Sequence, residues 1–270
     1  MVSSCQLKSL SLSIRANIRD IRTYHHLLSG KMVKTAFASA SIYDEDLIIQ
    51  AKKLHASVYL NRGFISLDHL DAQGVLKLDH DPHQNHATYF VVTENSEIGN
   101  PIIATARQIS ATEEMGFDSF PILEQARLFP KDKRRIKRGL PQDYVEISGL
   151  AKAVGVSSMA PLFLYRAMWH YSLTTEQKYW LMACDVRLYK RLKLLFGPSI
   201  RQIGESSPYQ GGDVIPAILD IPSSLAVVSN TMPIFNPLNR RIRRAILVFF
   251  LEGLESKHSL AIDLDNVLSH

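Results

Sequence analysis

The sequence predicts an α/β protein with a mixed central β-sheet flanked by helices. Hydrophobic residues make up 46% of the 270 residues, enough to bury a sizeable core in one large domain. Residues 145–154 and 178–186 are apolar almost throughout, which is typical of strands covered on both faces, as in a parallel or mixed sheet. Segments with helical periodicity lie before, between and after these two strands. This alternation of helices and strands places the chain in the α/β class.

The first core element is an amphipathic helix. Within residues 44–59 the apolar side chains recur at the three-and-four spacing of a helix, and Gly63 is expected to end it. Lys52, Lys53 and His55 fall outside this apolar stripe, so we expect them on the other faces of the helix.

A long polar connection follows, up to about residue 88. Connections beyond about 12 to 15 residues are commonly functional or disordered in compact domains. This one carries several histidines and aspartates around Pro82, and imidazole and carboxylate are usual metal ligands. Because these residues are confined to one loop with no helical pair of ligands behind them, we expect no metal site. A substrate-facing loop, in which one carboxylate orients a polar ligand, is the favoured interpretation.

A β-hairpin is expected next. Residues 87–93 are rich in β-branched and aromatic types, residues 97–100 supply a turn, and residues 101–109 return with Arg107 near their far end. Between the hairpin and the central strand, the sequence predicts only a short helix at 122–128.

The second half of the chain is organised around the central strand, which opens with Glu146. Residues 158–173 form a helix that is apolar on nearly all sides and is therefore expected to be buried. The remaining elements, in order, are a strand at 178–186, an amphipathic helix at 187–196, a short strand at 200–205, a strand at 214–221 and a C-terminal helix at 239–254.

The net charge of +5 is unevenly distributed. Residues 1–40 contain several lysines and arginines but only Asp20 as an acid, and we interpret them as a basic N-terminal extension without a catalytic part. The helix at 239–254 begins with arginines and continues into an apolar run, so it either packs on the core or lies at a lipid interface or dimer contact. The predicted organisation is this extension, an α/β domain at 41–238, and a C-terminal amphipathic helix and tail at 239–270.

A second basic segment, residues 131–138, precedes the central strand. Its cations include Lys133, Arg134, Arg135 and Lys137. Such a run is either a solvated loop or helix end, or a docking surface for an acidic partner or an anionic lipid.

Several classes of protein lack support. Cys5 and Cys184 are the two cysteines and lie far apart, so a disulfide framework or a paired-cysteine zinc site is not expected, and a reducing, cytoplasmic compartment is. The longest apolar run, residues 245–251, is too short to span a membrane. No serine elbow, P-loop or dinucleotide fingerprint is present. A mild positive charge without a recognition motif gives little support for nucleic-acid binding.

The order of elements and a set of motifs resemble the acyltransferases of the GCN5-related N-acetyltransferase (GNAT) superfamily. Within it, residues of about 44–222 look most like the autoinducer-synthase branch, and especially the long-chain N-acyl amino acid synthases. The matching motifs are Val58-Tyr59 with Arg62-Gly63-Phe64; Asp81-Pro82 with Asn85-His86-Ala87-Thr88-Tyr89-Phe90-Val91-Val92; Ala104-Thr105-Ala106-Arg107; Glu146-Ile147-Ser148-Gly149-Leu150-Ala151; and Tyr209 with Ile215-Pro216-Ala217.

The resemblance implies a GNAT-like mixed sheet in which the strands 145–154 and 178–186 are parallel and splay apart. The gap would hold the phosphopantetheine arm of an acyl thioester donor, with no tightly bound cofactor, and a backbone N–H of the central strand would stabilise the oxyanion. Glu146 would be the catalytic base that deprotonates the acceptor amine, directly or through water. Alternatively, Glu146 is a structural carboxylate paired with Arg107.

The resemblance also implies a set of substrate-binding residues. Arg62, Asp81 and Arg107 match positions that surround the acceptor or brace the acyl pocket, and a guanidinium suits the carboxylate of an amino acid acceptor. Alternatively, these charges only tie the polar loop to the sheet. The remaining expected substrate-binding residues are Ser148, Gly149 and Cys184.

Two departures from the family pattern narrow the expected substrates. Gly149 stands where autoinducer synthases usually carry an arginine, which argues against an S-adenosylmethionine acceptor and homoserine-lactone chemistry. The segment Lys152–Ser157 only approximates the glycine-rich loop that cradles the pyrophosphate of coenzyme A. An acyl carrier protein is therefore the expected donor, and because carrier proteins are acidic, the basic residues of 131–138 are expected to steer it.

The sequence thus favours a cytoplasmic N-acyltransferase that moves a long acyl chain from a carrier-protein thioester to the amine of an amino acid. One alternative is an enzyme that uses acyl-coenzyme A and another small amine. A second alternative is a catalytically silent regulatory or membrane-surface binding protein on the same scaffold, with its basic ends making a peripheral membrane contact.

Overall fold

The computed structural model describes residues 26–28, 31–39, 45–94, 101–156, 160–209, 212–224 and 249–250. The expected turn at 97–100 lies outside these residues, as do residues 1–25 and all of the expected C-terminal helix except residues 249 and 250.

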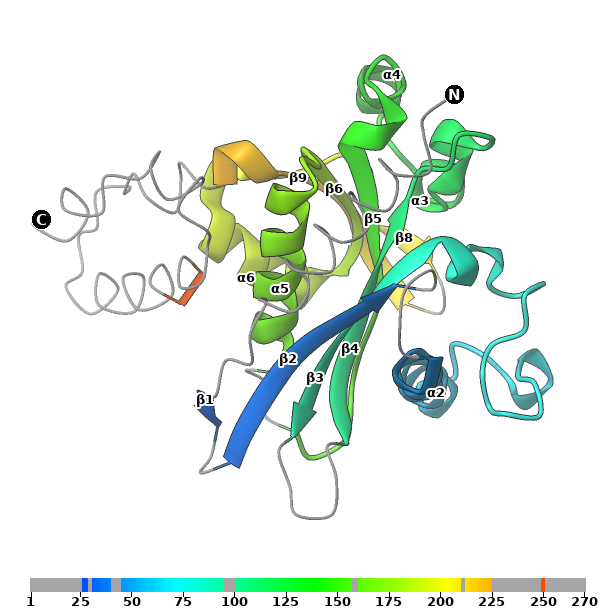
Figure 1. Cartoon of the computed structure of the whole chain (residues 1–270). Helices are drawn as coiled ribbons and strands as arrows, with labels where there is room; N and C mark the ends of the chain where they lie inside the picture. Colours follow the sequence, from blue (N-terminus) through cyan, green and yellow to red (C-terminus); the bar gives the residue numbers. More distant parts are fainter. Residues whose placement is uncertain are drawn as a thin grey trace, which may run out of the picture.

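The centre of the molecule is a mixed nine-stranded sheet (Figure 1). The strands follow the order β1-β2-β3-β4-β5-β6-β9-β7, and β8 pairs with β9. Their bounds are β1 His26–Leu28, β2 Lys31–Ser39, β3 Ala87–Glu94, β4 Ile102–Ser110, β5 Tyr144–Lys152, β6 Tyr179–Asp185, β7 Ile200–Gln202, β8 Ser207–Tyr209 and β9 Gly212–Asp220. This arrangement confirms the predicted fold class, a mixed sheet flanked by helices.

The sheet contains one parallel pair, β5 with β6, among the described strands; the other pairs are antiparallel. The two strands pair from Tyr144 opposite Tyr179 to Ile147 opposite Met182, and there the pairing stops. Both strands nevertheless continue, β5 to Lys152 and β6 to Asp185. The parallel pair therefore splays open in the middle of the sheet, as expected for strands 145–154 and 178–186.

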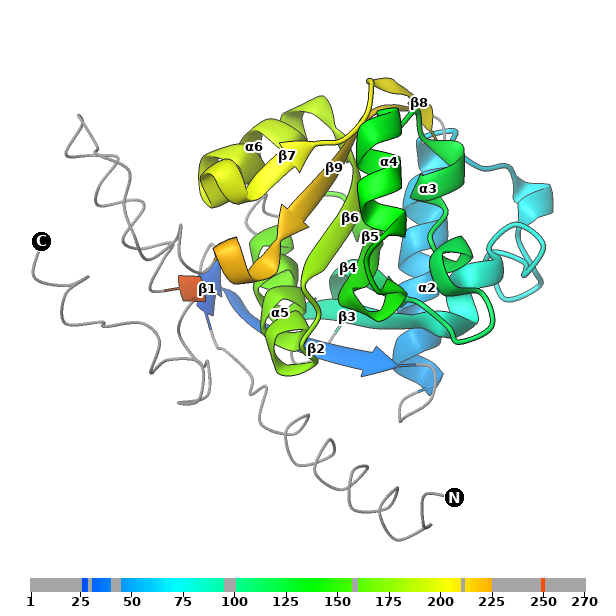
Figure 2. The ribbon, with the colours of Figure 1, turned by 90° about the horizontal axis from the view of Figure 1, so that it is seen from above.

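Helices cover both faces of the sheet (Figure 2). Helices α5 (Ala160–Thr174) and α6 (Val186–Phe196) lie on one face, which we call the α5 face. The opposite face, the α2 face, carries α2 (Glu45–Asn61), α3 (Ile122–Gln125) and α4 (Pro130–Lys137). The short 3₁₀ turns are η1 Leu67–His69, η2 Pro82–His86, η3 Gly116–Ser119, η4 Pro141–Asp143 and η5 Gly197–Ser199.

The largest hydrophobic core lies on the α5 face. Its fully buried aromatic side chains include Trp169 and Phe163 from α5 and Trp180 from β6. α5 is buried on most sides, as its all-round apolar sequence predicted. Phe250 packs edge-on against Trp169 and Phe196, so this part of the C-terminal segment contacts the core.

Most elements appear where the periodicity placed them. α2 ends near Gly63, whose φ of 71° is a left-handed conformation that favours glycine after a helix. β3 and β4 form the expected antiparallel hairpin. The basic segment 131–138 is the helix α4. β8 was not predicted, because its residues include Pro208 and resemble a turn.

The N-terminal boundary differs from the prediction. β2 lies inside the segment 1–40 that the sequence assigned to an extension, yet it pairs with β3 over its length. The abundance of lysine and serine in the surrounding segment hid the alternation of Val33, Thr35 and Phe37, which is the pattern of a strand. The sheet therefore begins well before residue 41.

Among the described helices, none is long and apolar enough to serve as a membrane span.

Candidate functional site

A buried ion pair lies at the centre of the α2 face. Arg107 of β4 donates from Nη1 to Oδ2 of Asp81 over 2.5 Å, and from Nε to Oγ of Ser148 on β5 over 2.9 Å. Arg107 and Asp81 are each only 6% exposed, so both charges are withdrawn from water. Burial alone would lower the pKa of Arg107, but the Asp81 carboxylate outweighs burial and holds that pKa above its usual value. Arg107 is therefore cationic and braces β5 against the polar loop.

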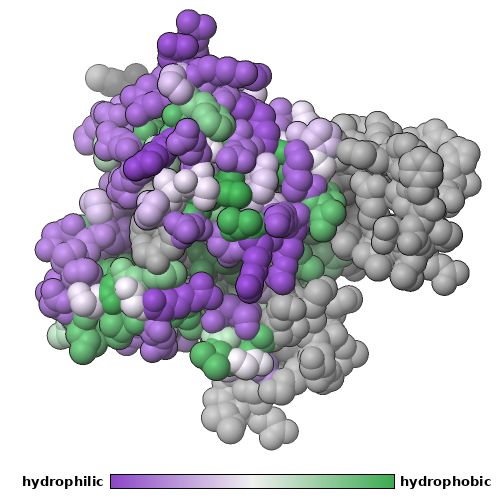
Figure 3. All heavy atoms as spheres, turned by 180° about the vertical axis from the view of Figure 1, so that it is seen from behind, coloured by the Kyte–Doolittle hydropathy of each residue, from purple (hydrophilic) through white to green (hydrophobic). Residues whose placement is uncertain are grey.

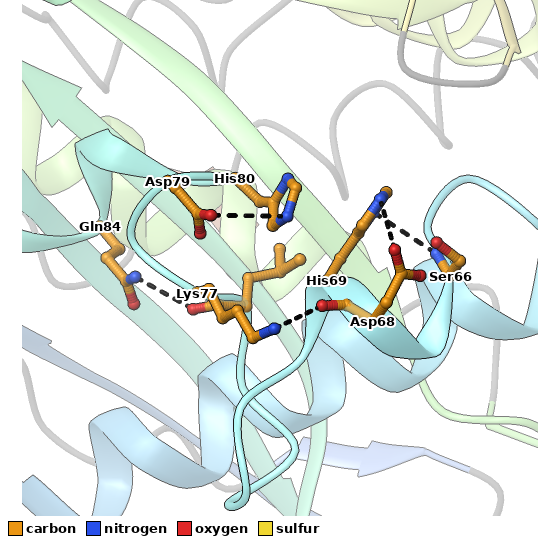
Figure 4. A network of polar contacts seen from close by, with 8 residues as sticks. Ser66, Asp68, His69, Lys77, Asp79, His80 and Gln84 are labelled. Atoms are coloured by element: carbon orange, nitrogen blue, oxygen red, sulfur yellow. Dashed lines mark hydrogen bonds and ion pairs between the residues drawn. The ribbon is translucent and has the colours of Figure 1, made fainter.

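The loop that carries Asp81 has hydrogen bonds of its own. The Asp71 carboxylate accepts from the backbone N–H groups of Gln73 and Val75. Lys77 Nζ donates to the carbonyl of Asp68 over 2.6 Å, and Gln84 donates to the carbonyl of Leu76 (Figure 4). These bonds fold the loop on itself and fix the position of Asp81 at its end.

Two imidazoles stack within the same loop. The rings of His69 and His80 lie 4.1 Å apart, and each is next to an aspartate that precedes it in the sequence (Figure 4). The described residues include no group of three histidine, cysteine or acidic side chains that could hold a metal ion. The loop thus folds around its own polar contacts and carries Asp81 at its end.

α2 contributes two polar side chains, His55 and Lys52, beside the ion pair. His55 is buried and its ring packs edge-on against Tyr59, with the centroids 4.2 Å apart. Lys52, one turn earlier, places its ammonium 5.7 Å from the ring centroid of Tyr89 on β3. Burial lowers the pKa of His55 well below its usual value, and the nearby Arg107 cation lowers it further. The imidazole is therefore neutral at neutral pH.

The expected position of His55 was wrong. The sequence placed it with Lys52 and Lys53 outside the apolar stripe of the helix, but its side chain is buried at the sheet. His55 follows Ala51 by four residues and Ile48 by seven, which is the spacing of one buried helical face, and this spacing is the sequence signal that could have found it.

Gly149 produces a bulge in β5 beside these groups. Arg107 pairs with Ser148 and Thr105 pairs with Ala151, so β5 has one more residue than β4 between these pairs. The φ of Gly149 is 63°, in the left-handed region. A Cβ on Gly149 would lie 3.4 Å from both the His55 ring and the Arg107 side chain. The bulge thus coincides with the start of the splay and leaves room for His55.

Glu146 lies three residues earlier, on the same face. It is 1% exposed, and its Oε2 accepts a hydrogen bond from the backbone N–H of Ile122, the first residue of α3, over 2.9 Å. Burial raises the pKa of Glu146 to about 8, while the Ile122 N–H and the Arg107 cation oppose the rise. Asp81, not Glu146, is the carboxylate paired with Arg107.

Two predicted residues lie apart from this cluster. Arg62 is exposed at the end of α2, with its guanidinium 5.9 Å from the Phe64 ring centroid. Cys184 is buried on the α5 face, in the part of β6 that pairs with β9 but no longer with β5, and burial raises the pKa of its thiol to about 12. The structure therefore brings together Asp81, Arg107, Ser148 and Gly149, but not Arg62 or Cys184.

The basic residues of α4 lie on the surface at another part of the α2 face. Asp132 is buried and binds Arg201 of β7 over 2.5 Å, which fixes the helix to the sheet. Its exposed cations are Arg134, Arg135 and Lys137, and Lys133 is partly exposed. Hydrophilic side chains cover the projecting end of the molecule formed by this region (Figure 3). A cavity of about 440 Å³ beside α4 is lined by Arg135 and other residues, none of them from the Arg107 cluster.

Comparison with solved structures identifies the architecture of the chain. No protein-family model and no curated protein matches the sequence. Among solved structures, FeeM, an N-acyl amino acid synthase from uncultured soil microbes, superposes with a TM-score of 0.52 at 15% identity, over 73% of this chain and 94% of that chain. The acyl-homoserine lactone (AHL) synthase LasI gives a TM-score of 0.54 at 13% identity, over 77% of this chain and 100% of the other.

A third structure extends the comparison. The coenzyme A-dependent acyl-homoserine lactone synthase BjaI, with S-adenosylmethionine and isopentyl-coenzyme A, gives a TM-score of 0.52 at 14% identity, over 81% of this chain and 90% of the other. At this identity the likeness concerns the fold. The chain has the autoinducer-synthase form of the GNAT fold, as the motifs predicted.

Proposed function

We propose that this protein is an N-acyltransferase that moves a long-chain acyl group from an acyl carrier protein thioester to the amine of an amino acid. The observation that carries the proposal is the splay of β5 from β6, since pairing ends at Ile147 and Met182 while both strands continue. Backbone groups of the two strands that face the gap lack a strand partner there. An extended thioester arm is a group that such a gap can bind.

The splay also supplies the means to stabilise the transition state. When an amine attacks a thioester, negative charge develops on the carbonyl oxygen. A backbone N–H fixed by the sheet is a preorganised donor for that oxygen and needs no reorganisation during the reaction. The bulge at Gly149 redirects the backbone of β5 where the gap begins, and this supports the assignment of such a donor to β5 beside the Arg107 cluster.

Glu146 is the proposed catalytic base. An acceptor amine is protonated in water and must lose a proton before it attacks. A carboxylate whose pKa is about 8 holds a proton strongly enough to take it from an ammonium group near neutral pH. The bond from Ile122 occupies one carboxylate oxygen and leaves the other for the amine or for a water that connects to it.

An amino acid acceptor suits the charges of the cluster. The Nη1 and Nε donors of Arg107 are already bound to Asp81 and Ser148, so its cation acts chiefly through its field. Lys52 makes no ion pair with the described residues, and burial lowers its pKa although Asp81 opposes this. A ligand carboxylate beside Lys52 would favour its charged form, and Arg62 offers a further cation at the end of the same helix.

A carrier protein is the proposed donor, with α4 as its docking surface. Lys133, Arg134, Arg135 and Lys137 present positive charge to an acidic partner. α4 packs through Ile136 on Tyr144 at the start of β5. The unpaired part of β5 starts at Ser148, roughly 13 Å further at about 3.3 Å per residue. A carrier docked on α4 would therefore extend its arm along the strand to reach the gap.

The test is an acyl-transfer assay with dodecanoyl carrier protein and dodecanoyl-coenzyme A as donors and the twenty protein amino acids as acceptors, read by mass spectrometry. The wild-type protein should form an N-dodecanoyl amino acid, faster with the carrier protein. Glu146→Gln should reduce kcat on the order of 10²-fold to 10⁴-fold. Wild-type protein without product from either donor would refute the activity.

A charge-reversal variant tests the docking surface separately from the chemistry. Reversal of charge at Lys133, Arg134, Arg135 and Lys137 should slow the reaction with the carrier protein and leave that with dodecanoyl-coenzyme A unchanged. An equal effect on both donors would refute the docking role of α4.

Glu146→Gln has a second readout, which is the pH dependence of stability. In wild type the pKa of Glu146 rises on folding from 4.5 to about 8, so stability should fall as pH rises across that range. The variant should lose this fall.

A further inference from the structure

The imidazole of His55 lies between α2 and the bulge of β5. Its ring packs on Tyr59 on one side. On the other side its Cε1 approaches Gly149, where an added Cβ would lie 3.4 Å away. Arg107 meets the same point of Gly149 at 3.4 Å from its Cγ. His55 is thus a side chain of α2 that reaches the point where the sheet opens.

The Nε2 atom of His55 has no hydrogen-bond partner in the described part of the chain, although the residue is only 6% exposed. Buried polar atoms are nearly always paired, so an unpaired one needs an explanation such as a ligand or a catalytic role. The Tyr89 hydroxyl, in a residue 2% exposed on the neighbouring β3, lies beside the Arg107 guanidinium, which lowers its pKa against the effect of burial. The unpaired nitrogen of His55 beside these groups favours a polar ligand here.

We propose that His55 is a second proton acceptor of the acyl transfer, whose Nε2 takes a proton from the acceptor nitrogen after that nitrogen attacks the thioester and returns it to the departing thiolate. This inference rests on the proposed function. It adds a catalytic residue from α2 to the carboxylate that opens β5.

The proton balance requires two proton transfers from the acceptor nitrogen. An ammonium group has three hydrogens and the amide product has one, so two protons leave the nitrogen. Glu146 takes the first and passes it to solvent, which makes the amine nucleophilic. The free amine then forms a C–N bond with the thioester carbon and becomes positively charged. His55 Nε2 takes the second proton, the C–S bond breaks, and the thiolate leaves with the electron pair and receives that proton from the imidazolium.

The surroundings of His55 suit this second transfer. Tyr59 from α2, Arg107 from β4 and Gly149 from β5 lie next to His55. The groups that lie around Arg107 in turn are Lys52, Asp81, Tyr89 and Ser148. Burial and the Arg107 cation keep the imidazole neutral and disfavour the imidazolium. A protonated imidazole here is consequently a strong acid that gives its proton to a thiolate. Nε2 accepts a proton when the ring carries its hydrogen on Nδ1.

The structure offers a matched control. His170 on α5 is also buried, at 5% exposure, and burial lowers its pKa to about 4. Its Nε2 is bound to the carbonyl of Phe250 over 2.6 Å, on the opposite face of the sheet. The two histidines thus differ in whether Nε2 is paired and in which face they occupy.

The experiment compares His55→Gln with His170→Gln in the dodecanoyl-transfer assay, using the amino acid that gives the most product with wild type. His55→Gln should lower kcat by about 10²-fold with a smaller change in the acceptor KM. Added imidazole should restore part of the rate of His55→Ala and leave wild type unaffected. His170→Gln should keep the wild-type kcat, although its melting temperature falls.

The outcomes separate this inference from the proposed function. If His55→Gln keeps the wild-type kcat while Glu146→Gln loses activity, His55 has no such role and the acyltransferase stands. If wild type forms no product, both proposals fall. Wild-type NMR covers the case of variants that do not fold: the Nε2 resonance of His55 should shift when the acceptor amino acid is added, and an unmoved resonance would overturn the inference.

Discussion

The two faces of the sheet use buried polar groups in different ways. On the α5 face these groups support the core: Trp169 donates to Ser224, Trp180 donates to Ser172, and Gln108 of β4 donates to the Met168 carbonyl. On the α2 face, by contrast, the same sheet buries an arginine and an aspartate together with the neutral imidazole of His55. The α5 face buries neutral polar groups and the Arg166 guanidinium in an aromatic core, whereas the α2 face buries an ion pair beside the splay.

This difference between the faces indicates that the buried polar groups of the α5 face serve stability and those of the α2 face serve function. Burying a charge is costly unless a partner compensates it, and a hydrophobic pair of similar shape is often as stable. The Arg107–Asp81 pair is therefore poorly explained by stability alone, whereas fixed charges beside the splay suit a reaction in which charge develops. The α5 face, with its dense aromatic packing, supplies the rigidity that holds these charges in place.

The largest expected effect comes from breaking the ion pair. Arg107→Met leaves the Asp81 carboxylate buried without its partner and should lower the free energy of unfolding by about 3–5 kcal/mol. The double variant Arg107→Met with Asp81→Asn should be more stable than Arg107→Met alone, because no buried charge remains. Urea denaturation of wild type and the variants measures both quantities. A double variant as unstable as the single one would show that the pair is a structural requirement.

A smaller effect is expected at the bulge. Gly149→Ala forces a non-glycine residue into a left-handed conformation, which costs about 1–2 kcal/mol, and adds a contact with His55 and Arg107. Gly155→Ala is the matched control, since its φ is 79° but an added Cβ meets nothing within 4 Å. Both should lose stability in urea, and Gly149→Ala alone should also lower acyl transfer. Equal activity in the two variants would mean that the space beside Gly149 is unimportant.

The smallest expected effect comes from the same substitution, tyrosine to phenylalanine, made on each face of the sheet. Tyr165 on α5 buries a hydroxyl without a hydrogen-bond partner among the described residues, whereas the buried Tyr89 hydroxyl on β3 lies beside the Arg107 guanidinium. Removing an unpaired hydroxyl should stabilise the fold, so Tyr165→Phe should raise the free energy of unfolding by about 1 kcal/mol and leave turnover unchanged. Tyr89→Phe should instead lower kcat/KM for the acceptor by about 5-fold to 10-fold, as for one lost hydrogen bond. If Tyr89→Phe had the same kcat/KM for the acceptor as wild type, this result would contradict a polar ligand on the α2 face.

The helices and central strands were predictable because their hydrophobic periodicity reflects how each is buried. β5 and β6 are covered on both faces and therefore read as continuous apolar runs, and α5 is apolar on nearly all sides for the same reason. β2 was missed because basic and serine-rich composition outweighed its alternation. Local composition is a weak guide where pairing with a distant strand decides the structure.

The candidate site was predictable only in part. The motifs placed Asp81 and Arg107 in one group, although the two residues are distant in sequence and no local pattern joins them. The sequence named Glu146 as the carboxylate that pairs with Arg107, and the structure shows Asp81 instead. The splay was expected from the same resemblance and appears in the register of β5 and β6. His55 was missed because a helical pattern assigns a polar residue to solvent by default, and only the bulge at Gly149 makes room for it at the sheet.

The short parallel pairing of β5 with β6 has a mechanical consequence. Ordinary sheets lose protection first at their edges, where strands have one neighbour. Among the described strands, the antiparallel halves β1–β5 and β6–β9 pair only between residues 144–147 and 179–182, and the Lys178 N–H extends this pairing by a bond to the Asp143 carbonyl. Backbone amides of β5 that point into the gap should therefore exchange with solvent faster than those it shares with β4. The sheet therefore has its fewest interstrand hydrogen bonds near its centre. An extended chain bound in the gap would supply the missing hydrogen bonds between its halves.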